Sequence, residues 1–407
     1  MANYVILRDR SRMSRARGMM GGFGALAAPG AMPGLESAAP PDPQVESADL
    51  SPSDVRDVQR DPTVAALARS MPIKLIEPEG EAADAASGGA QATWGVEAVG
   101  ALNANETGAD TLMCILDTGI DASHAAFAGM TLDQRDFTGS GNGDVQGHGT
   151  HCAGTIFGRD VDGMRIGVAP GVERALIGKV LGNDGSGSSD WLFDAMQWAM
   201  EQEAQVLSMS LGFDFPGFAK QLIDQGFPEL LATSVALEGY RMNLRVFDGL
   251  MDLMRARAAF SGGCVVCAAS GNESERQIDP QFEVSASLPS AAVGVVSVGA
   301  LGESEDGLVV ADFSNTNPIL SAPGVNVVSA KTGGGLMALN GTSMATPHVA
   351  GLAALWWERA RNGAFLPTSG GVAARLRAAC RTDVFAPGVD LADRGDGLAQ
   401  APVPLGS

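Results

Sequence analysis

The sequence is short of aromatic residues and cysteine, and it has no long apolar run. Phe, Trp and Tyr make up 5% of its 407 residues, so a folded core has to be built mainly from Ala, Val, Leu, Met and Gly. The five cysteines are an odd number without a framework spacing, which argues against a disulfide scaffold. No segment approaches the roughly 18 consecutive apolar residues of a membrane-spanning helix, so we expect no membrane partner.

Positive charge is also scarce. The chain has 27 Lys and Arg against 47 Asp and Glu, for a net charge of −20. Residues 1–78 contain nine basic and nine acidic residues, so the rest of the chain carries the whole net charge. Such an acidic surface argues against nucleic acid or an anionic membrane as a partner, and it would suit basic substrates.

The N-terminus lacks the order of a secretory signal. A short apolar run comes first and five arginines follow by residue 17, whereas a signal peptide places its charge before a longer apolar stretch. We therefore expect a cytoplasmic protein, with secretion by another route left open.

Residues 1–78 are expected to form a small α+β unit. Its strand, strand, helix and strand signals lie, in order, at residues 3–8, 45–50, 51–58 and 61–76. Residues 18–44 are rich in Gly, Ala, Pro and Met without periodicity, which predicts a flexible linker inside this unit. Small and polar residues at 79–93 predict a second linker.

Residues 94–402 alternate strand and helix signals. Apolar runs that end in glycine-rich turns stand at residues 111–116, 175–180, 206–210, 264–269 and 293–298. One face of an amphipathic helix is marked by Trp191, Leu192, Ala195, Met196 and Ala199. The alternation predicts an α/β domain with a mostly parallel central sheet flanked by helices.

Three short segments supply an Asp, a His and a Ser. They are Leu-Asp-Thr-Gly at 116–119, Gly-His-Gly-Thr-His at 147–151 and Gly-Thr-Ser-Met-Ala at 341–345. A serine hydroxyl is a poor nucleophile at pH 7, and it needs a base that is itself oriented by an acid. The spacing and neighbours of Asp117, His148 and Ser343 therefore indicate a serine hydrolase.

In order and surroundings these motifs resemble those of the subtilases, the peptidase S8 family, from about Trp94 to Pro402. Residues 1–78 more weakly resemble the inhibitor-type propeptide of that family. The resemblance implies a subtilisin-like three-layer fold and a serine endopeptidase that works through an acyl-enzyme. It further implies an autoinhibited precursor whose partners are a protein or peptide substrate and its own N-terminal propeptide, with no cofactor required.

The resemblance also assigns the catalytic roles. Ser343 would be the nucleophile, His148 the general base and Asp117 the acid that orients His148. Asn272, in Ala-Ala-Ser-Gly-Asn-Glu at 268–273, would form the oxyanion hole.

Substrate-binding residues follow from the same resemblance. Ser210, Leu211 and Gly212 look like the strand that pairs with an extended substrate backbone. Around Asn272, the residues expected at the S1 pocket are Ala269, Ser270, Gly271 and Glu273. The carboxylate of Glu273 would favour Lys or Arg before the scissile bond.

The remaining His and Cys residues receive structural interpretations. His151 and His348 occupy motif positions that are structural in the family, and His124 is expected in a surface turn. Cys152 is expected beneath the catalytic His, where it would make the enzyme sensitive to thiol reagents. Cys264 and Cys267 are expected to be buried thiols and not a redox or zinc pair.

Calcium is the one metal that the resemblance suggests. Asp160 and Asp162, in the loop after the His motif, could serve as hard oxygen ligands. The family's site also takes a carboxylate shortly after Asp-Thr-Gly, and this chain has none at the matching place. We therefore commit to no metal ligands.

An insertion at residues 213–262 exceeds what a minimal subtilase needs. Two helices are expected in it, at about 228–238 and 240–259, and its flanking strands should bring it near the substrate cleft. It either covers the core or selects a substrate or partner.

Two other functions remain open beside a general endopeptidase. One is an intracellular processing or regulatory protease dedicated to a single partner protein. The other is a non-catalytic binding protein on this fold, which the four intact catalytic positions disfavour. A lipase of the α/β-hydrolase type is disfavoured because it needs Gly-x-Ser-x-Gly and the order Ser, Asp, His.

Overall fold

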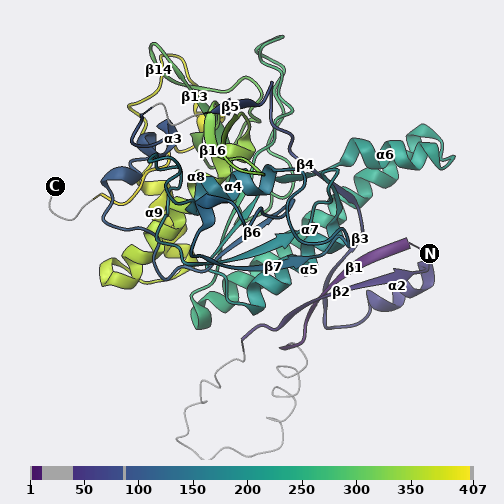
Figure 1. The fold of residues 1–407 in the computed structure, drawn as a ribbon. Coiled ribbons are helices and arrows are strands. Elements are labelled where there is room, and N and C mark those ends of the chain that lie inside the picture. Colours follow the sequence, from purple (N-terminus) through teal and green to yellow (C-terminus); the bar gives the residue numbers. More distant parts are fainter. Residues whose placement is uncertain (1, 12–39, 86–88, 404–407) are drawn as a thin grey trace, which may run out of the picture.

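The computed structural model describes residues 2–11, 40–85 and 89–403, and it divides into a small antiparallel sheet and a large α/β body (Figure 1). Most of the linker predicted at residues 18–44 lies outside the described residues, and its last two residues already belong to strand β2 (Pro43–Leu50). None of the helices in the described part of the chain is long and apolar enough to cross a membrane.

A twisted, mostly parallel sheet forms the centre of the large body. Its strand order is β14-β13-β12-β10-β6-β8-β7, and β15 pairs with β13 as well. Every pair is parallel except β13 with β14. The predicted α/β architecture with a mostly parallel sheet is confirmed. The strands are β6 (Met113–Asp117), β7 (Thr131–Asp136), β8 (Arg174–Lys179), β10 (Val206–Met209), β12 (Val265–Ala269), β13 (Val296–Ser304), β14 (Gly307–Val310) and β15 (Leu320–Pro323).

Helices cover both faces of this sheet because its strands are apolar on both sides. Along β6, Met113 and Ile115 belong to the apolar cluster that contains α4, α8 and α9, whereas Cys114 and Leu116 belong to the cluster that contains α5 and α7. Successive side chains on a strand point to opposite faces, so one apolar strand serves two helical layers. These helices are α4 (His148–Phe157), α5 (Ser189–Glu201), α7 (Glu229–Ser261), α8 (Thr342–Arg359) and α9 (Ser369–Ala378).

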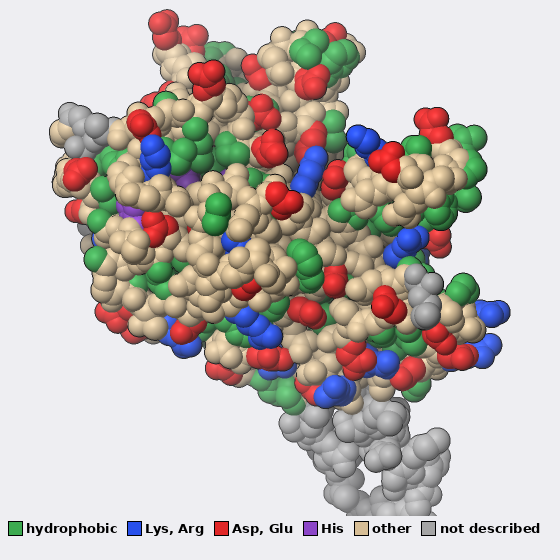
Figure 2. All heavy atoms as spheres, turned by 45° about the vertical axis from the view of Figure 1, so that its right-hand side comes forward, with side chains coloured by type: hydrophobic (Ala, Val, Ile, Leu, Met, Phe, Trp, Pro, Cys, Tyr) green, Lys and Arg blue, Asp and Glu red, His purple; other side chains and the backbone are tan. Residues whose placement is uncertain are grey.

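The large body also contains several short helical segments. They are α3 (Trp94–Ala98), η1 (Ala101–Asn103), η2 (Ala125–Phe127), η3 (Ala360–Ala364) and α10 (Leu391–Arg394). In the space-filling view, acidic side chains spread over the visible face and do not gather in a single patch (Figure 2).

The N-terminal sheet packs on the large body. Its central strand β1 (Ala2–Asp9) pairs antiparallel with β2 and with β3 (Val64–Arg69). Its helix α2 (Pro52–Val58) begins at Ser51, whose hydroxyl accepts a hydrogen bond from the Asp54 N–H in a capping box. Strands β2 and β3 contact α5 and α7, so two helices of the large body carry the small sheet (Figure 1).

Both polar and apolar contacts hold this sheet. Val5 and Leu7 are buried in the same apolar cluster as α5 and α7. From α7, the Asn243 side chain donates to the Arg69 carbonyl at 2.8 Å. From α5, the Gln197 side chain accepts from the Val45 N–H.

The insertion at 213–262 differs from the prediction in two respects. It contains an unpredicted helix α6 (Phe215–Asp224), and the two predicted helices are one continuous α7. Gly239 lies inside α7 and packs against Met71 and Phe218. A Cβ at this position would lie 3.3 Å from the Met71 sulfur, so the glycine serves this packing and does not end the helix.

The chain between the two parts forms two further strands. Strand β4 (Pro72–Leu75) lies between β9 (Ser186–Ser188) and β11 (Leu211–Phe213), antiparallel to both. Strand β5 (Ala83–Ala85) pairs with β17 (Leu336–Leu339), which pairs with β16 (Val327–Ala330). The segment predicted as a linker at 79–93 therefore contains a strand.

Candidate active site

The carboxylate of Asp117 and the imidazole of His148 meet inside the large body. Asp117 is the last residue of β6, at the carboxyl end of a parallel strand, where ligand sites of such sheets gather. His148 is the first residue of α4. The His148 Nδ1 lies 2.8 Å from the Asp117 Oδ1, and both side chains are almost completely buried.

The buried carboxylate controls the charge of His148. Burial by itself lowers the pKa of His148, but the charge and hydrogen bond of Asp117 outweigh it, and the pKa lies well above the ordinary value. Cys152 lies beneath the ring, with its Sγ 3.7 Å from the His148 Nδ1. Burial raises the pKa of Cys152, so it is a neutral thiol. Asp117 is therefore placed to stabilise an imidazolium at His148.

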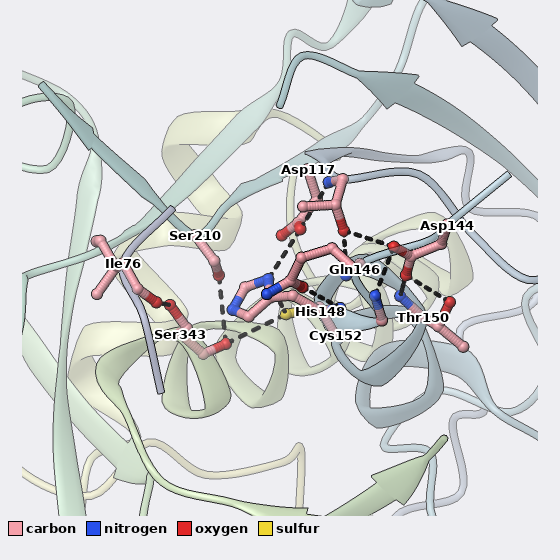
Figure 3. Close-up of polar contacts among 12 residues, drawn as sticks. Ile76, Asp117, Asp144, Gln146, His148, Thr150, Cys152, Ser210 and Ser343 are labelled. Atoms are coloured by element: carbon pink, nitrogen blue, oxygen red, sulfur yellow. Dashed lines mark hydrogen bonds and ion pairs between the residues drawn. The ribbon is translucent and has the colours of Figure 1, made fainter. Parts of the chain in front are cut away.

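Asp144 holds the two loops that carry this pair. One of its oxygens accepts from the Thr118 hydroxyl at 2.9 Å and from the Gly147 N–H at 2.7 Å. The other accepts from the Thr150 N–H at 2.8 Å and from the Thr150 hydroxyl at 2.6 Å. Asp144 thus ties the residue after Asp117 to the first turn of the His148 helix (Figure 3). The sequence analysis missed it; its signal was an Asp four residues before the His, at a helix N-terminus.

The two loops also approach each other too closely for side chains. A Cβ on Gly149 would lie 2.2 Å from the Gly119 carbonyl oxygen. The small residues of both motifs therefore let Asp117 and His148 come within hydrogen-bonding distance.

Ser343 lies in the first turn of α8, and its carbonyl joins three elements. In a helix this carbonyl would accept from residue 347, but Pro347 has no N–H. The Ser343 carbonyl instead accepts from the Ser210 hydroxyl at 3.2 Å and from the Cys152 thiol at 3.4 Å. Ser210, predicted to bind substrate, is thus bonded to the backbone of Ser343, the predicted nucleophile.

The Ser343 side chain contacts the chain's own N-terminal region. The Ser343 hydroxyl donates to the Ile76 carbonyl at 3.1 Å. Within the described part of the chain, the buried Nε2 of His148 has no hydrogen-bond partner. The imidazole lies between Asp117 and Ser343, with the Asp117 side bonded and the Ser343 side open (Figure 3).

Asn272 points its amide nitrogen into the same place. Its Oδ1 accepts from the Thr342 N–H at 2.9 Å and from the Thr342 hydroxyl at 2.8 Å, which leaves the Nδ2 to donate to the Glu77 carbonyl at 2.9 Å. Gly341, with φ of 154°, passes closely under this amide; a Cβ there would lie 3.1 Å from the Asn272 Nδ2.

The N-terminal segment runs through this site as an extended chain. Leu75 and Lys74 pair with Leu211 and Gly212, which the sequence analysis predicted to pair with a substrate backbone. Beyond the site, the Glu79 N–H donates to the Asn340 carbonyl at 2.9 Å, and the chain continues into β5. Ser343 and Asn272 therefore contact two consecutive carbonyls, those of Ile76 and Glu77.

The other predicted S1 residues form the wall behind Asn272. Ala269 ends β12, the Ser270 N–H donates to the Val298 carbonyl at 3.0 Å, and the Gly271 N–H donates to the Thr342 hydroxyl at 3.2 Å. The Glu273 carboxylate accepts from the Asn315 amide at 2.7 Å.

Asn315 is a second residue that the sequence analysis missed. Its Oδ1 accepts from the Glu273 and Ser274 N–H groups at 3.0 and 3.1 Å, so it fixes the backbone that carries Asn272. No motif marks it, because its role depends on tertiary contact.

His151 and His348 are buried and neutral. Burial lowers the pKa of His151 to about 3 and that of His348 to about 4. The His151 Nε2 donates to the Val327 carbonyl at 3.0 Å. The surface turn predicted for His124 is wrong: this residue is 4% exposed, and its Nδ1 accepts from the Ala126 N–H because it caps η2.

The described residues give no support to a calcium site. Their one close group of three metal-ligating side chains is Asp117, His148 and Cys152. The negative charge of Asp160 raises the pKa of Arg165, although burial of the guanidinium lowers it more. Asp160 and Asp162 alone do not make a calcium site, and we assign no step to a metal.

Comparison with known proteins places this geometry among proteases. Residues 108–392, more than half of the chain, match the model of the subtilase family. An intracellular serine protease of Paenibacillus polymyxa is 33% identical over 260 residues, which are 62% of this chain and 68% of that protein. The major intracellular serine protease of Bacillus subtilis (strain 168) is 31% identical over 61% of this chain and 68% of its own length. M-protease of Shouchella clausii (strain KSM-K16) is 32% identical over 76% of this chain and 68% of its own length.

Replacing Asp117 by Asn should lower the pKa of His148 to below its ordinary value of about 6.5, because burial then acts without an opposing charge. NMR titration of His148 in the full chain, with Ser343→Ala as background, measures this pKa directly. In the background protein we expect a value well above 6.5. Since a general base must be neutral, catalysis that depends on His148 should rise as the pH increases through this pKa.

The matched control for this titration is Asp121→Asn. The Asp121 carboxylate bonds Ser123 and Gly333, so this variant should leave the pKa of His148 unchanged. Equal pKa values for His148 in the background and in Asp117→Asn would contradict the electrostatic role of Asp117.

Asp144→Asn should destabilise the protein by about 2–4 kcal/mol, because an amide nitrogen would face two donors at a buried position. Chemical denaturation measures the loss. Asp184→Asn is the control, since its carboxylate accepts from Ser186 in an exposed turn and should cost less than about 1 kcal/mol. Equal losses in the two variants would show that Asp144 has no special structural role.

Proposed function

Because this chain belongs to the subtilase family and is a serine endopeptidase, we propose that Asp117, His148, Ser343 and Asn272 are its catalytic residues, and that its own N-terminal segment holds it in an autoinhibited state. Both parts of the proposal rest on the position of residues 72–79. This segment lies in the cleft as an extended chain, with its carbonyls bonded to Ser343 and Asn272.

The proposed reaction follows from the contacts of the four residues. The Ser343 hydroxyl attacks the scissile carbonyl while His148 takes its proton, and Asp117 stabilises the imidazolium that forms. The Asn272 amide donates to the oxyanion, which is worth about 10²–10³ in turnover in serine proteases of this type. His148 then gives the proton to the leaving amine, an acyl-enzyme remains on Ser343, and a water molecule hydrolyses it by the same steps.

The bound segment is poorly placed for its own cleavage. In a productive complex, the nucleophile and the oxyanion donor act on the same carbonyl group. Here Ser343 contacts Ile76 and Asn272 contacts Glu77, so neither carbonyl receives both. Pro78 fixes its own φ and restricts Glu77 to extended conformations, which resists the rotation that would bring one carbonyl to both groups.

The N-terminal region contacts the large body in two places, and both contacts support self-inhibition. The sheet of β1, β2 and β3 packs on α5 and α7, and β4 then continues directly into the cleft. Because both belong to one chain, the effective concentration of the segment at the cleft is high and no second molecule is needed. We propose that peptide hydrolysis begins only when this segment leaves.

We also propose that the protein acts inside the cell. Two of its relatives are named as intracellular serine proteases. Its substrates would then be intracellular proteins or peptides.

Ile73→Asp should release the segment and raise peptide hydrolysis at least about tenfold, because an unpaired carboxylate is costly at a position that is 1% exposed. Initial rates on a mixed peptide library, with unfolding temperature as the folding check, measure the effect. Gln59→Asp adds the same charge at an exposed position and should leave the rate unchanged. A folded Ile73→Asp protein that is no faster than the wild type would argue against autoinhibition.

Slow self-processing should cut after Ile76, since the Glu77–Pro78 bond has an imide nitrogen. Intact mass after incubation should show loss of this N-terminal piece in the wild type, faster loss in Pro78→Ala and no loss in Ser343→Ala. If Ser343→Ala loses the same piece, another protease removes it. If Ile73→Asp is active and every chain stays full length, residues 1–78 are a permanent domain.

A further inference from the structure

A cavity beside the bound segment shares Glu273 with the predicted S1 residues and is otherwise lined by residues outside them. It has a volume of about 350 Å³ and lies next to Lys74 of β4, on the side of the cleft where α6 and α7 rise. Phe215 and Pro216 of α6, Leu237 and Tyr240 of α7, and Glu273 line it, together with residues 284–287. The insertion at 213–262 thus forms much of its wall, as its predicted position near the cleft suggested.

The cavity presents a partly exposed apolar surface. Leu237 and Val284, both in its lining, are 49% and 46% exposed. Its size falls in the range of ordinary ligand pockets, and it is larger than the lysine side chain beside it. An occupant with a longer apolar stem would bury these residues.

The position of the cavity along the cleft is set by strand pairing. Lys74 lies opposite Gly212, two residues before Ile76, whose carbonyl contacts Ser343. This pairing uses backbone atoms, so any peptide that replaces β4 puts a side chain at the same place. If Ile76 corresponds to P1, the residue before the scissile bond, then Lys74 corresponds to P3.

The charges around this position favour a cation. The Asp214 carboxylate lies 3.7 Å from the Lys74 Nζ and is 24% exposed, and the Glu273 carboxylate lines the cavity. Phe215 and Tyr240 pack edge to face, with ring centroids 6.4 Å apart. Burial raises the pKa of Tyr240, so its ring stays neutral. Aromatic faces beside carboxylates are good surroundings for a guanidinium group.

We propose that this cavity is the subsite for the P3 residue of the substrate, and that it selects arginine or lysine through the carboxylate of Asp214. The proposal rests on the proposed function, because it takes the cleft occupied by β4 as the substrate cleft. It narrows the substrates to chains with a basic residue two positions before the P1 residue. In the precursor, Lys74 then lies at the wall of this subsite, with its Nζ 3.7 Å from the Asp214 carboxylate.

Competition between peptides tests this in the full-length Ile73→Asp chain. Four peptides, identical except for Arg, Lys, norleucine or Glu at P3, are mixed, and mass spectrometry gives the ratios of their kcat/KM values. All four peptides compete for the same enzyme molecules. The fraction of molecules whose cleft is open therefore multiplies every rate equally and cancels in these ratios. We expect Arg and Lys to be cleaved about two- to fivefold faster than norleucine, as a partly exposed ion pair allows, and Glu to be slowest.

Asp214→Asn, added to Ile73→Asp, is the decisive variant. Asp214 also caps α6 by accepting from the Gly217 N–H, and Asn keeps that function while it removes the charge. We expect the Arg-to-norleucine and Lys-to-norleucine ratios to fall towards one, with the unfolding temperature unchanged. Asp224→Asn, at the last residue of the same helix, should keep the ratios of the parent chain.

Three results would overturn the proposal. First, the peptide with norleucine at P3 could be cleaved as fast as those with Arg and Lys. Second, the kcat/KM ratios could depend on charge but stay unchanged in Asp214→Asn. Either result would contradict the subsite and leave the proposed function intact. If Ile73→Asp is folded and cleaves none of these peptides or a mixed library, the proposed function fails together with the subsite.

Discussion

The hydrogen bond between Asp117 and His148 is the interaction on which the rest of the site depends. A carboxylate and an imidazole can be buried side by side only if the pair is bonded and its supports are satisfied. The parallel sheet supplies Asp117 at a strand end, and α4 supplies His148 at its first residue. The four hydrogen bonds of Asp144 join the two loops, and the absence of a side chain on Gly149 allows the close approach. Each of these features would have little purpose without the 2.8 Å contact between the two side chains.

The cleft and the N-terminal region form one continuous unit around this pair. Backbone pairing with β9 and β11 holds β4 on one side of Ser343, and pairing with β17 holds β5 on the other. The chain therefore crosses the site under restraint at both ends. The segment cannot slide by one residue without breaking both sheets. This restraint explains how Ser343 and Asn272 can contact two different carbonyls, those of Ile76 and Glu77, where in the proposed reaction both would act on one substrate carbonyl.

The sequence sufficed for those features that depend on local pattern. The apolar runs predicted the strands of the central sheet, and the three motifs named Asp117, His148 and Ser343 because each stands at the end or start of an element. Asn315 and β5 could not be predicted, since both depend on contacts between segments far apart in the chain. The single helix α7 was divided wrongly at Gly239, because the propensity of glycine gives no information on the packing of Met71 and Phe218 against it. Burial of His124 was missed for the same reason, since it follows from its contact with the Gly335 carbonyl.

Pro347 changes how the peptide unit of Ser343 is held. By removing one bond of the α8 ladder, it frees the Ser343 carbonyl for Ser210, which follows β10, and for Cys152 of α4. The peptide unit of Ser343 is thereby clamped to one wall of the cleft and to the helix that carries His148. Two neighbouring segments therefore hold the residue that we propose as the nucleophile, at the cost of a single helical hydrogen bond.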